Sequence, residues 1–201
     1  MSVVSSETSA VVTERSRQPR SDSLRNRVRI LEAAEEVFGS EGLSVPIDDI
    51  AERAGVGVGT IYRHFPTKET LFEAIVLRHF ERLVDEARRR GAAEDAAGAL
   101  FGFLGELVAE AVDKRDLADA LAGAGIDVKA TAGGLKQDME AAIEHLLVRA
   151  QREGTIRPDV SVADLMGLVG GSCMTAERFG GSAGSPGRML AVVCDGLRRT
   201  D

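Results

Sequence analysis

Residues 47–65 read IDDIAERAGVGVGTIYRHF, and this stretch decides the fold of the amino-terminal part of the chain. Four apolar residues recur at three- and four-residue steps and share one face of a short helix: Ile47, Ile50, Ala51 and Ala54. Gly55 ends that helix, and Gly55 or Gly57 supplies the positive φ that a sharp turn between two packed helices requires. A second short helix over residues 60–65 follows, and Pro66 ends it. The stretch therefore predicts a helix-turn-helix.

The second of these helices has an inward and an outward face. Its inward residues are spaced to pack on the neighbouring helices, and the expected core consists of Phe38, Ile50, Ala51, Gly55, Ile61 and Phe65. The outward positions hold Thr60, Tyr62, Arg63 and His64. Hydroxyl, guanidinium and imidazole groups on a short exposed helix suit contacts to phosphates and base edges. We expect this face to bind nucleic acid; the alternative is a purely structural pair of helices.

Helical periodicity continues on both sides of this stretch. A first helix is predicted to begin at Leu24 and to stop near Gly39 and Gly42. Thr67 is the expected N-cap of a long amphipathic helix that ends before Gly91. Further helices are predicted at 95–113, 115–122, 127–153, 162–179 and 186–199. Because no stretch alternates strictly between apolar and polar residues, the chain is predicted to be all-α, with roughly nine helices.

The charge of the chain is acidic overall but uneven. A formal charge of −7 argues against nucleic-acid binding by bulk positive charge. Residues 15–30, however, hold six arginines against one acid, Asp22. Residues 1–70 carry 9 basic and 11 acidic residues and residues 71–201 carry 16 and 21, so the later part supplies −5 of the −7. The arginine-rich beginning of the chain is either a solvated tail or an arm that contacts DNA.

Several classes of protein are disfavoured by the sequence. No apolar run approaches the ~18 residues of a membrane span, and no secretory signal is apparent. The two cysteines, Cys173 and Cys194, have no metal-binding spacing and are either structural thiols or redox sensors. No nucleophile–base pair, metal cluster or phosphate loop is visible. We therefore expect a cytoplasmic protein that is no enzyme and has no cofactor, metal or membrane segment.

Residues 27–76 resemble the DNA-binding domain of the TetR family of transcriptional regulators. The resemblance lies in ILEAAEEVF (30–38), IAERAGV (50–56) and GTIYRHF (59–65), followed by Lys68, Glu69 and Leu71. It implies a homodimer, a three-helix amino-terminal domain that binds double-stranded operator DNA, and a larger helical domain for dimerisation and a small-molecule effector. Residues 150–159 also resemble a segment common in one actinobacterial-type subgroup.

Carried over position by position, the resemblance marks Tyr62, His64 and Lys68 as phosphate contacts, and Val58 and Thr60 as positions near the major groove. The complete set of expected DNA-binding residues is Arg27, Val58, Gly59, Thr60, Tyr62, Arg63, His64 and Lys68. Two positions depart from the family pattern. Pro46 stands near a place where the family often has a Thr N-cap, and Val58 stands where it often has Ser.

The helix predicted at 162–179 contains several glycines, each of which costs a helix about 1 kcal/mol relative to Ala. Close approach of a second subunit explains them, so we expect a dimer interface that includes Gly167, Gly170, Gly171, Met174 and, on the last helix, Val193. Four other residues either line an effector pocket or fill a core: Phe101, Leu104, Met139 and Ile143.

These observations predict a disordered tail over 1–23, a helix-turn-helix domain over 24–70 and a ligand-binding and dimerisation domain over 71–201. The expected function is that of a ligand-responsive repressor on a palindromic operator, with activation left open. The rival is an interaction module that kept the scaffold but lost DNA binding, a reading supported by Val58, Pro46 and the acidic total.

Overall fold

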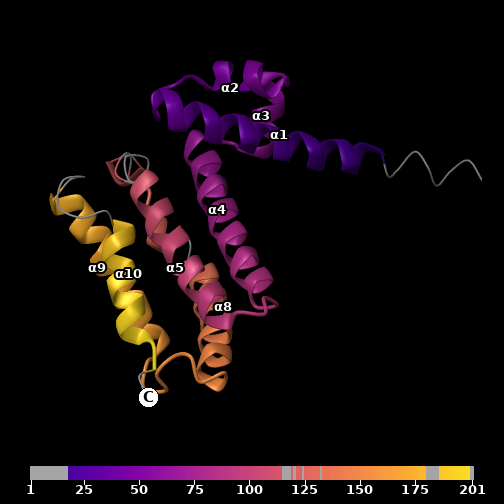
Figure 1. Cartoon of the computed structure of the whole chain (residues 1–201). Helices are drawn as coiled ribbons and strands as arrows, with labels where there is room; N and C mark the ends of the chain where they lie inside the picture. The colour runs from indigo at the N-terminus through magenta and orange to yellow at the C-terminus, as the bar shows by residue number, and fades with distance from the viewer. Residues whose placement is uncertain are drawn as a thin grey trace, which may run out of the picture. The chain divides into compact units, whose positions relative to one another are not determined.

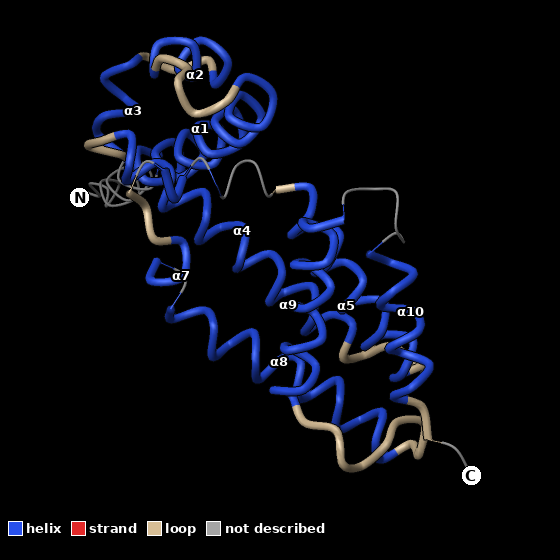
Figure 2. Tube along the Cα trace, turned by 90° about the vertical axis from the view of Figure 1, so that its left-hand side faces the viewer, coloured by secondary structure: helices blue, strands red, loops and turns tan. Residues whose placement is uncertain are grey.

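The structure is a computed structural model that describes residues 18–114, 119, 121–123, 125–131, 133–179 and 186–199. Within these residues the regular structure is helical, and the extended pairing consists of one isolated bridge between Ile156 and Arg198 (Figure 2). The all-α prediction is confirmed. The helices with assigned bounds are α1 (Gln18–Glu41), α2 (Ile47–Ala54), α3 (Val58–His64), α4 (Lys68–Arg90), α5 (Ala96–Asp113), α7 (Val128–Thr131), α8 (Gly133–Arg152), α9 (Val162–Phe179) and α10 (Pro186–Leu197) (Figure 1).

The chain divides into two compact units, Met1–Phe72 and Glu73–Asp201. Helix α4 belongs to both, because its residues 68–72 lie in the first unit and its residues 73–90 lie in the second. The first unit contains the helix-turn-helix, and the second contains the larger helical core.

In the first unit, α1 begins at Gln18, six residues before the predicted start at Leu24. Pro19 is compatible with a first helical turn, and Asp22 forms an ion pair with Arg25 one turn later. Leu24 and Val28 are 66% and 46% exposed, because the first turns of α1 extend past α2 and α3 (Figure 1). The expected tail is thus partly helical; its residues 1–17 lie outside the described part.

In the second unit, α5, α8, α9 and α10 surround one hydrophobic core. Its completely buried side chains include Leu100, Phe103, Ile143, Leu146 and Leu165. Cys194 on α10 is buried in this core, and burial raises the pKa of its thiol, which disfavours the reactive thiolate.

Two predicted helices of this unit have different ends in the structure. The segment 127–153 is divided into α7, whose start is capped by Asp127 through a bond to the Ala130 amide (3.1 Å), and α8, which begins with the weak helix formers Gly133 and Gly134. The last helix stops at Leu197 instead of residue 199, because Arg199 donates its amide to the Thr155 carbonyl (3.1 Å). Of the helix expected at 115–122, only residues 119, 121 and 122 are described.

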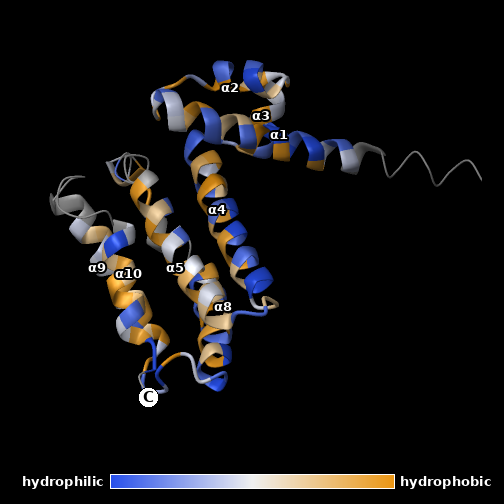
Figure 3. Cartoon of the chain, in the orientation of Figure 1, coloured by the Kyte–Doolittle hydropathy of each residue, from blue (hydrophilic) through white to orange (hydrophobic). Residues whose placement is uncertain are grey.

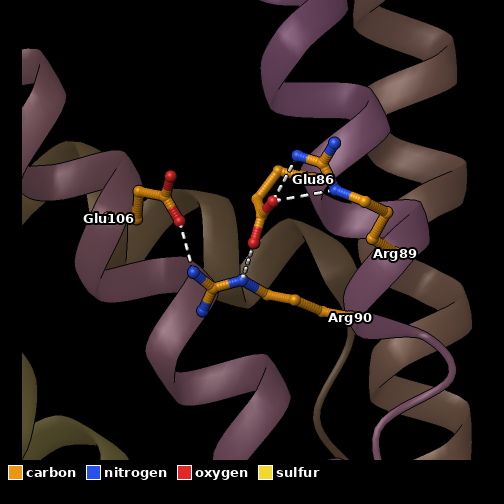
Figure 4. A network of polar contacts seen from close by, with 4 residues as sticks. All are labelled: Glu86, Arg89, Arg90 and Glu106. Atoms are coloured by element: carbon orange, nitrogen blue, oxygen red, sulfur yellow. Dashed lines mark hydrogen bonds and ion pairs between the residues drawn. The ribbon is translucent and has the colours of Figure 1, made fainter.

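A polar network joins α4 to α5 (Figure 4). Glu86 accepts hydrogen bonds from Arg89 and from Arg90 (2.7 Å to Arg90 Nε), and Arg90 also donates to Glu106 (2.5 Å). Further along the same two helices, His79 lies 3.0 Å from a Glu110 carboxylate oxygen and 3.2 Å from the Lys114 ammonium. Burial, assisted by the positive charges of Lys114 and Arg82, lowers the pKa of His79 to about 4, so the ring is neutral at neutral pH.

The core assignment of Leu104 can be tested by truncation. We expect Leu104→Ala, at a side chain that is 1% exposed, to lower the free energy of unfolding by about 2–5 kcal/mol, because it leaves a cavity. Val112→Ala on the same helix is the control: at 38% exposure, its effect should stay within about 0.5 kcal/mol. Denaturant unfolding measures both, and equal effects would contradict the assignment.

Candidate nucleic-acid interface

The turn between α2 and α3 is built around Gly55, which has φ 61° and ψ 42°. The Gly55 and Val56 amides donate to the Glu52 and Ala51 carbonyls, both at 3.0 Å, and close the end of α2. Arg29 on α1 donates to the Gly55 carbonyl (3.3 Å), and a Cβ atom at Gly55 would lie 2.5 Å from that Arg29 nitrogen. Gly55 is therefore favoured by its left-handed backbone conformation, as the sequence predicted for its φ, whereas the Arg29 side chain could move away from a Cβ atom.

Helix α3 begins at Val58, two residues before the predicted start, so the turn comprises residues 55–57. Ile61 and Phe65 are 1% and 2% exposed and anchor the helix to the rest of the first unit. On the other side, Tyr62 is 49% exposed and Arg63 is also exposed. Val58, Thr60 and His64 are half-buried at the edges of the helix rather than fully outward.

Gly59 lies on the exposed side of α3, next to Tyr62 and Arg63 along the helix. A Cβ atom built at Gly59 would meet no protein atom within 4 Å, and its φ is not in the left-handed region. The fold therefore does not need a glycine here.

Two of the expected DNA-binding cations are engaged inside the first unit. The Arg27 guanidinium lies 4.7 Å from the centre of the Phe65 ring, at the carboxyl end of α3, where a positive charge is favourable. The Lys68 ammonium donates to the Val45 carbonyl (2.5 Å) and lies 5.7 Å and 5.9 Å from the ring centres of Phe38 and Phe72. In the structure both cations therefore contact groups of the first unit itself.

The two neighbouring helix starts are capped differently. Pro46 occupies the N-cap of α2 and makes no side-chain bond, as its departure from the family pattern indicated. At the start of α4, the Thr67 hydroxyl accepts from the Thr70 amide (3.3 Å) and the Thr70 hydroxyl accepts from the Thr67 amide (3.2 Å). This reciprocal pair confirms Thr67 as the N-cap of α4.

Among the described residues, four of the five predicted for a dimer interface are exposed on α9, and the fifth, Val193 on α10, is not. Gly167, Gly170 and Gly171 are exposed, and a Cβ atom at any of them would meet nothing within 4 Å. Large apolar side chains lie exposed on the same two helices, namely Met166, Met174 and Val192, and Figure 3 shows hydrophobic residues along α10. Val193 is half-buried against the core. Met166 and Val192 are exposed but are not among the residues predicted for this interface.

The residues predicted for an effector pocket are packed into protein instead. Leu104, Met139 and Ile143 are 1%, 6% and 0% exposed within the core, and Phe101 is half-buried with the Arg198 guanidinium 5.1 Å from its ring centre. A cleft of about 270 Å³ lies instead along α4 and α5, and its lining was not foreseen because it is almost entirely charged: Arg82, Leu83, Asp85, Glu86, Arg89, Glu106 and Glu110. Its volume is near the lower end of ligand pockets, about 300 Å³.

Two other kinds of site were searched among the described residues. They contain no group of three or more His, Cys, Asp or Glu side chains arranged to hold a metal ion. No helix in the same part of the chain is both long and apolar enough to cross a membrane.

Two family models match the chain. The first, described as bacterial regulatory proteins, tetR family, matches residues 30–75, which contain the helix-turn-helix. The second, described as transcriptional regulator SbtR-like, C-terminal domain, matches residues 95–199, more than half of the chain.

Individual proteins and solved structures that resemble this chain are also transcriptional regulators. HTH-type transcriptional regulator UidR of Escherichia coli K12 is 30% identical over 141 residues, 68% of this chain and 72% of its own. A TetR transcription regulatory protein from Mycobacterium vanbaalenii is 43% identical, with a TM-score of 0.73, over 90% of this chain and 99% of its own. A TetR transcriptional regulator from Streptomyces coelicolor is 36% identical, with a TM-score of 0.71, over 87% and 99%.

The helix-turn-helix around Gly55, the exposed face of α3 and the helical second unit all agree with these matches, and the chain belongs to the TetR family of DNA-binding transcriptional regulators.

Proposed function

We propose that this regulator is a ligand-responsive repressor that binds a palindromic operator as a homodimer. The observation that carries the proposal is the geometry of α3. Ile61 and Phe65 fix one face of the helix in the core, while Tyr62 and Arg63 stand exposed on the other. A short helix anchored in this way suits insertion into a major groove.

We assign the contacts according to how each side chain lies. Arg63 and Tyr62 are exposed and placed to reach base edges or phosphates, with Gly59 allowing the DNA backbone to come close. Val58, Thr60 and His64 contribute from the edges of the helix. Arg27 keeps a positive charge beside the carboxyl end of α3 while its guanidinium lies over Phe65.

The dimer is proposed to form through the exposed face of α9 and α10. The helical glycines Gly167, Gly170 and Gly171 have open space in place of a neighbour, so a second backbone can approach there. Met174 and Val192 are 68% and 67% exposed on the same helices, and a partner that covered them would remove their apolar surface from water. A two-fold axis through this face would pair α9 and α10 with their copies in a four-helix bundle.

Such a dimer reads two half-sites. The two α3 helices should enter successive major grooves about 34–36 Å apart, one turn of DNA. An effector that binds the second unit acts through α4, because this helix runs from the second unit into the first. To reverse a 99:1 preference for the DNA-binding state, the effector must favour the other state by about 5.5 kcal/mol.

Selection of genomic fragments with the purified protein, followed by a salt titration on a recovered fragment, tests DNA binding directly. A dimer that neutralises roughly 6–10 phosphates should give a slope of log affinity against log salt of about −5 to −9. A flat response, or no recovered fragment, would instead support the interaction module. The genes beside the fragment would indicate the effector and the direction of regulation.

The dimer face is tested by Gly167→Leu. A Cβ atom at Gly167 meets no atom of the described residues within 4 Å, so the substitution should keep the fold but weaken dimerisation in sedimentation experiments by about tenfold or more. Gly134→Leu on α8 is the matched control, since its Cβ atom also meets nothing within 4 Å. Equal dimer affinity in both variants would argue against the proposed face.

Gly59→Ala separates stability from binding. Alanine should raise the free energy of unfolding by up to about 1 kcal/mol, because it favours the helix and has open space. Operator affinity should fall at the same time, because the new methyl group faces the DNA. Thermal unfolding and a binding titration measure the two effects, and unchanged affinity would show that the backbone at Gly59 does not approach DNA.

A further inference from the structure

The cleft along α4 and α5 is acidic in its less exposed part. Three half-buried carboxylates line it, Glu86 of α4 and Glu106 and Glu110 of α5. The other charged members of the lining are exposed, namely Arg82, Asp85 and Arg89. Glu106 and Glu110 are four residues apart and therefore lie one turn apart on the same face of α5. A ligand that enters the cleft thus meets carboxylates from both helices.

The protein itself seats a guanidinium group on two of these carboxylates. Arg90 donates through Nε to Glu86 at 2.7 Å and through Nη2 to Glu106 at 2.5 Å, so its guanidinium joins α4 to α5 (Figure 4). Such bonds are charge-assisted, and the planar guanidinium matches the geometry of carboxylates. Hydrogen bonds from Arg90 and then from Arg89 hold the pKa of Glu86 below its usual range, so this carboxyl is ionised at neutral pH.

Glu110, the third of these carboxylates, has acceptor capacity that the described part of the chain does not use. Its Oε2 atom is buried and accepts no hydrogen bond from the described residues. The His79 ring lies 3.0 Å from this atom but brings no positive charge at neutral pH, because burial lowers its pKa to about 4. A buried oxygen without a donor is costly, so a ligand N–H group that reached Glu110 would be favoured there.

Arg90 reaches α5 over a position that has no side chain. A Cβ atom at Gly102 would lie 2.8 Å from the Arg90 Nη1 atom, and the Arg90 guanidinium carbon lies 6.0 Å from the centre of the Phe103 ring. The bond to Glu106 is thus the charged contact through which Arg90 holds α4 to α5. A second cation on Glu106 competes directly with this contact.

We propose that the cleft binds a small organic cation, a guanidine or an amine, between Glu106 and Glu110, and that this cation displaces Arg90 from Glu106. The cleft volume of about 270 Å³ restricts the ligand to a small molecule. Displacement of Arg90 releases α4 from α5, and α4 continues into the first unit. The effect on DNA binding rests on the proposed function, whereas binding of the cation does not.

The test uses agmatine, which carries a guanidinium and an ammonium group, and tetramethylammonium, a cation without N–H donors. Isothermal titration calorimetry with the full-length protein measures the binding of both. The variants are Glu110→Gln, Arg90→Met and the matched control Glu144→Gln, whose parent side chain is exposed on α8 and does not line the cleft. Methionine at position 90 keeps an apolar stem beside Phe103 and removes the competing donors.

We expect agmatine to bind the parent protein saturably and tetramethylammonium not to bind, because the carboxylates need N–H donors as well as charge. Glu110→Gln should weaken agmatine binding about tenfold or more, because a charge-assisted bond is lost. Arg90→Met should strengthen it about tenfold, because the competing guanidinium is gone. Glu144→Gln should bind agmatine like the parent. Saturating agmatine should also lower the affinity of the parent for a recovered genomic fragment.

The proposal is overturned if agmatine does not bind the parent at concentrations up to about 10 mM, or if tetramethylammonium binds equally well. Equal agmatine affinity in Glu110→Gln and the parent would also overturn it. If Glu110→Gln fails to fold, Arg90→Met decides, and unchanged or weaker agmatine binding then contradicts the displacement. Binding without an effect on DNA affinity would refute the link to α4. If the parent recovers no DNA fragment, the proposed function fails, and calorimetry still decides whether the cleft binds the cation.

Discussion

Burial of Ile61 and Phe65 is the interaction on which the DNA-reading part of this protein depends. Helix α3 has only seven residues, and an isolated helix of that length is unstable in water. Its stability must therefore come from the apolar contacts that its inner face makes within the first unit, where both side chains are nearly inaccessible to water. The same contacts set its rotation, so they determine that Tyr62 and Arg63 stand outward.

Features that depend only on residues nearby in the sequence could be predicted well. Gly55 at the end of α2, Thr67 at the start of α4 and the buried periodic residues follow from rules that act over three or four residues. The ends of helices were less predictable where distant segments compete. Helix α10 stops at Leu197 because Arg199 bonds to Thr155, a partner more than forty positions earlier that no local pattern reveals.

The candidate site was only partly predictable for the same reason. Residue type and register indicated which positions carry hydroxyl, imidazole or cationic groups, but not where those groups point. Lys68 turns to a backbone carbonyl and Arg27 to an aromatic ring, and both arrangements depend on residues from separate helices. Leu104 and Ile143 would be apolar and helical whether they filled a core or lined an effector pocket. Only their burial in the folded chain shows that they fill the core.

The bridge between Ile156 and Arg198 has a practical consequence for work with this protein. It fastens the end of α10 to the segment after α8, with bonds from the Arg157 amide to Leu197 and from the Arg199 amide to Thr155. Residues 197–199 therefore hold α10 in its position on the core. Substitutions or insertions that disturb residues 197–199 should therefore loosen the packing of α10 on the core.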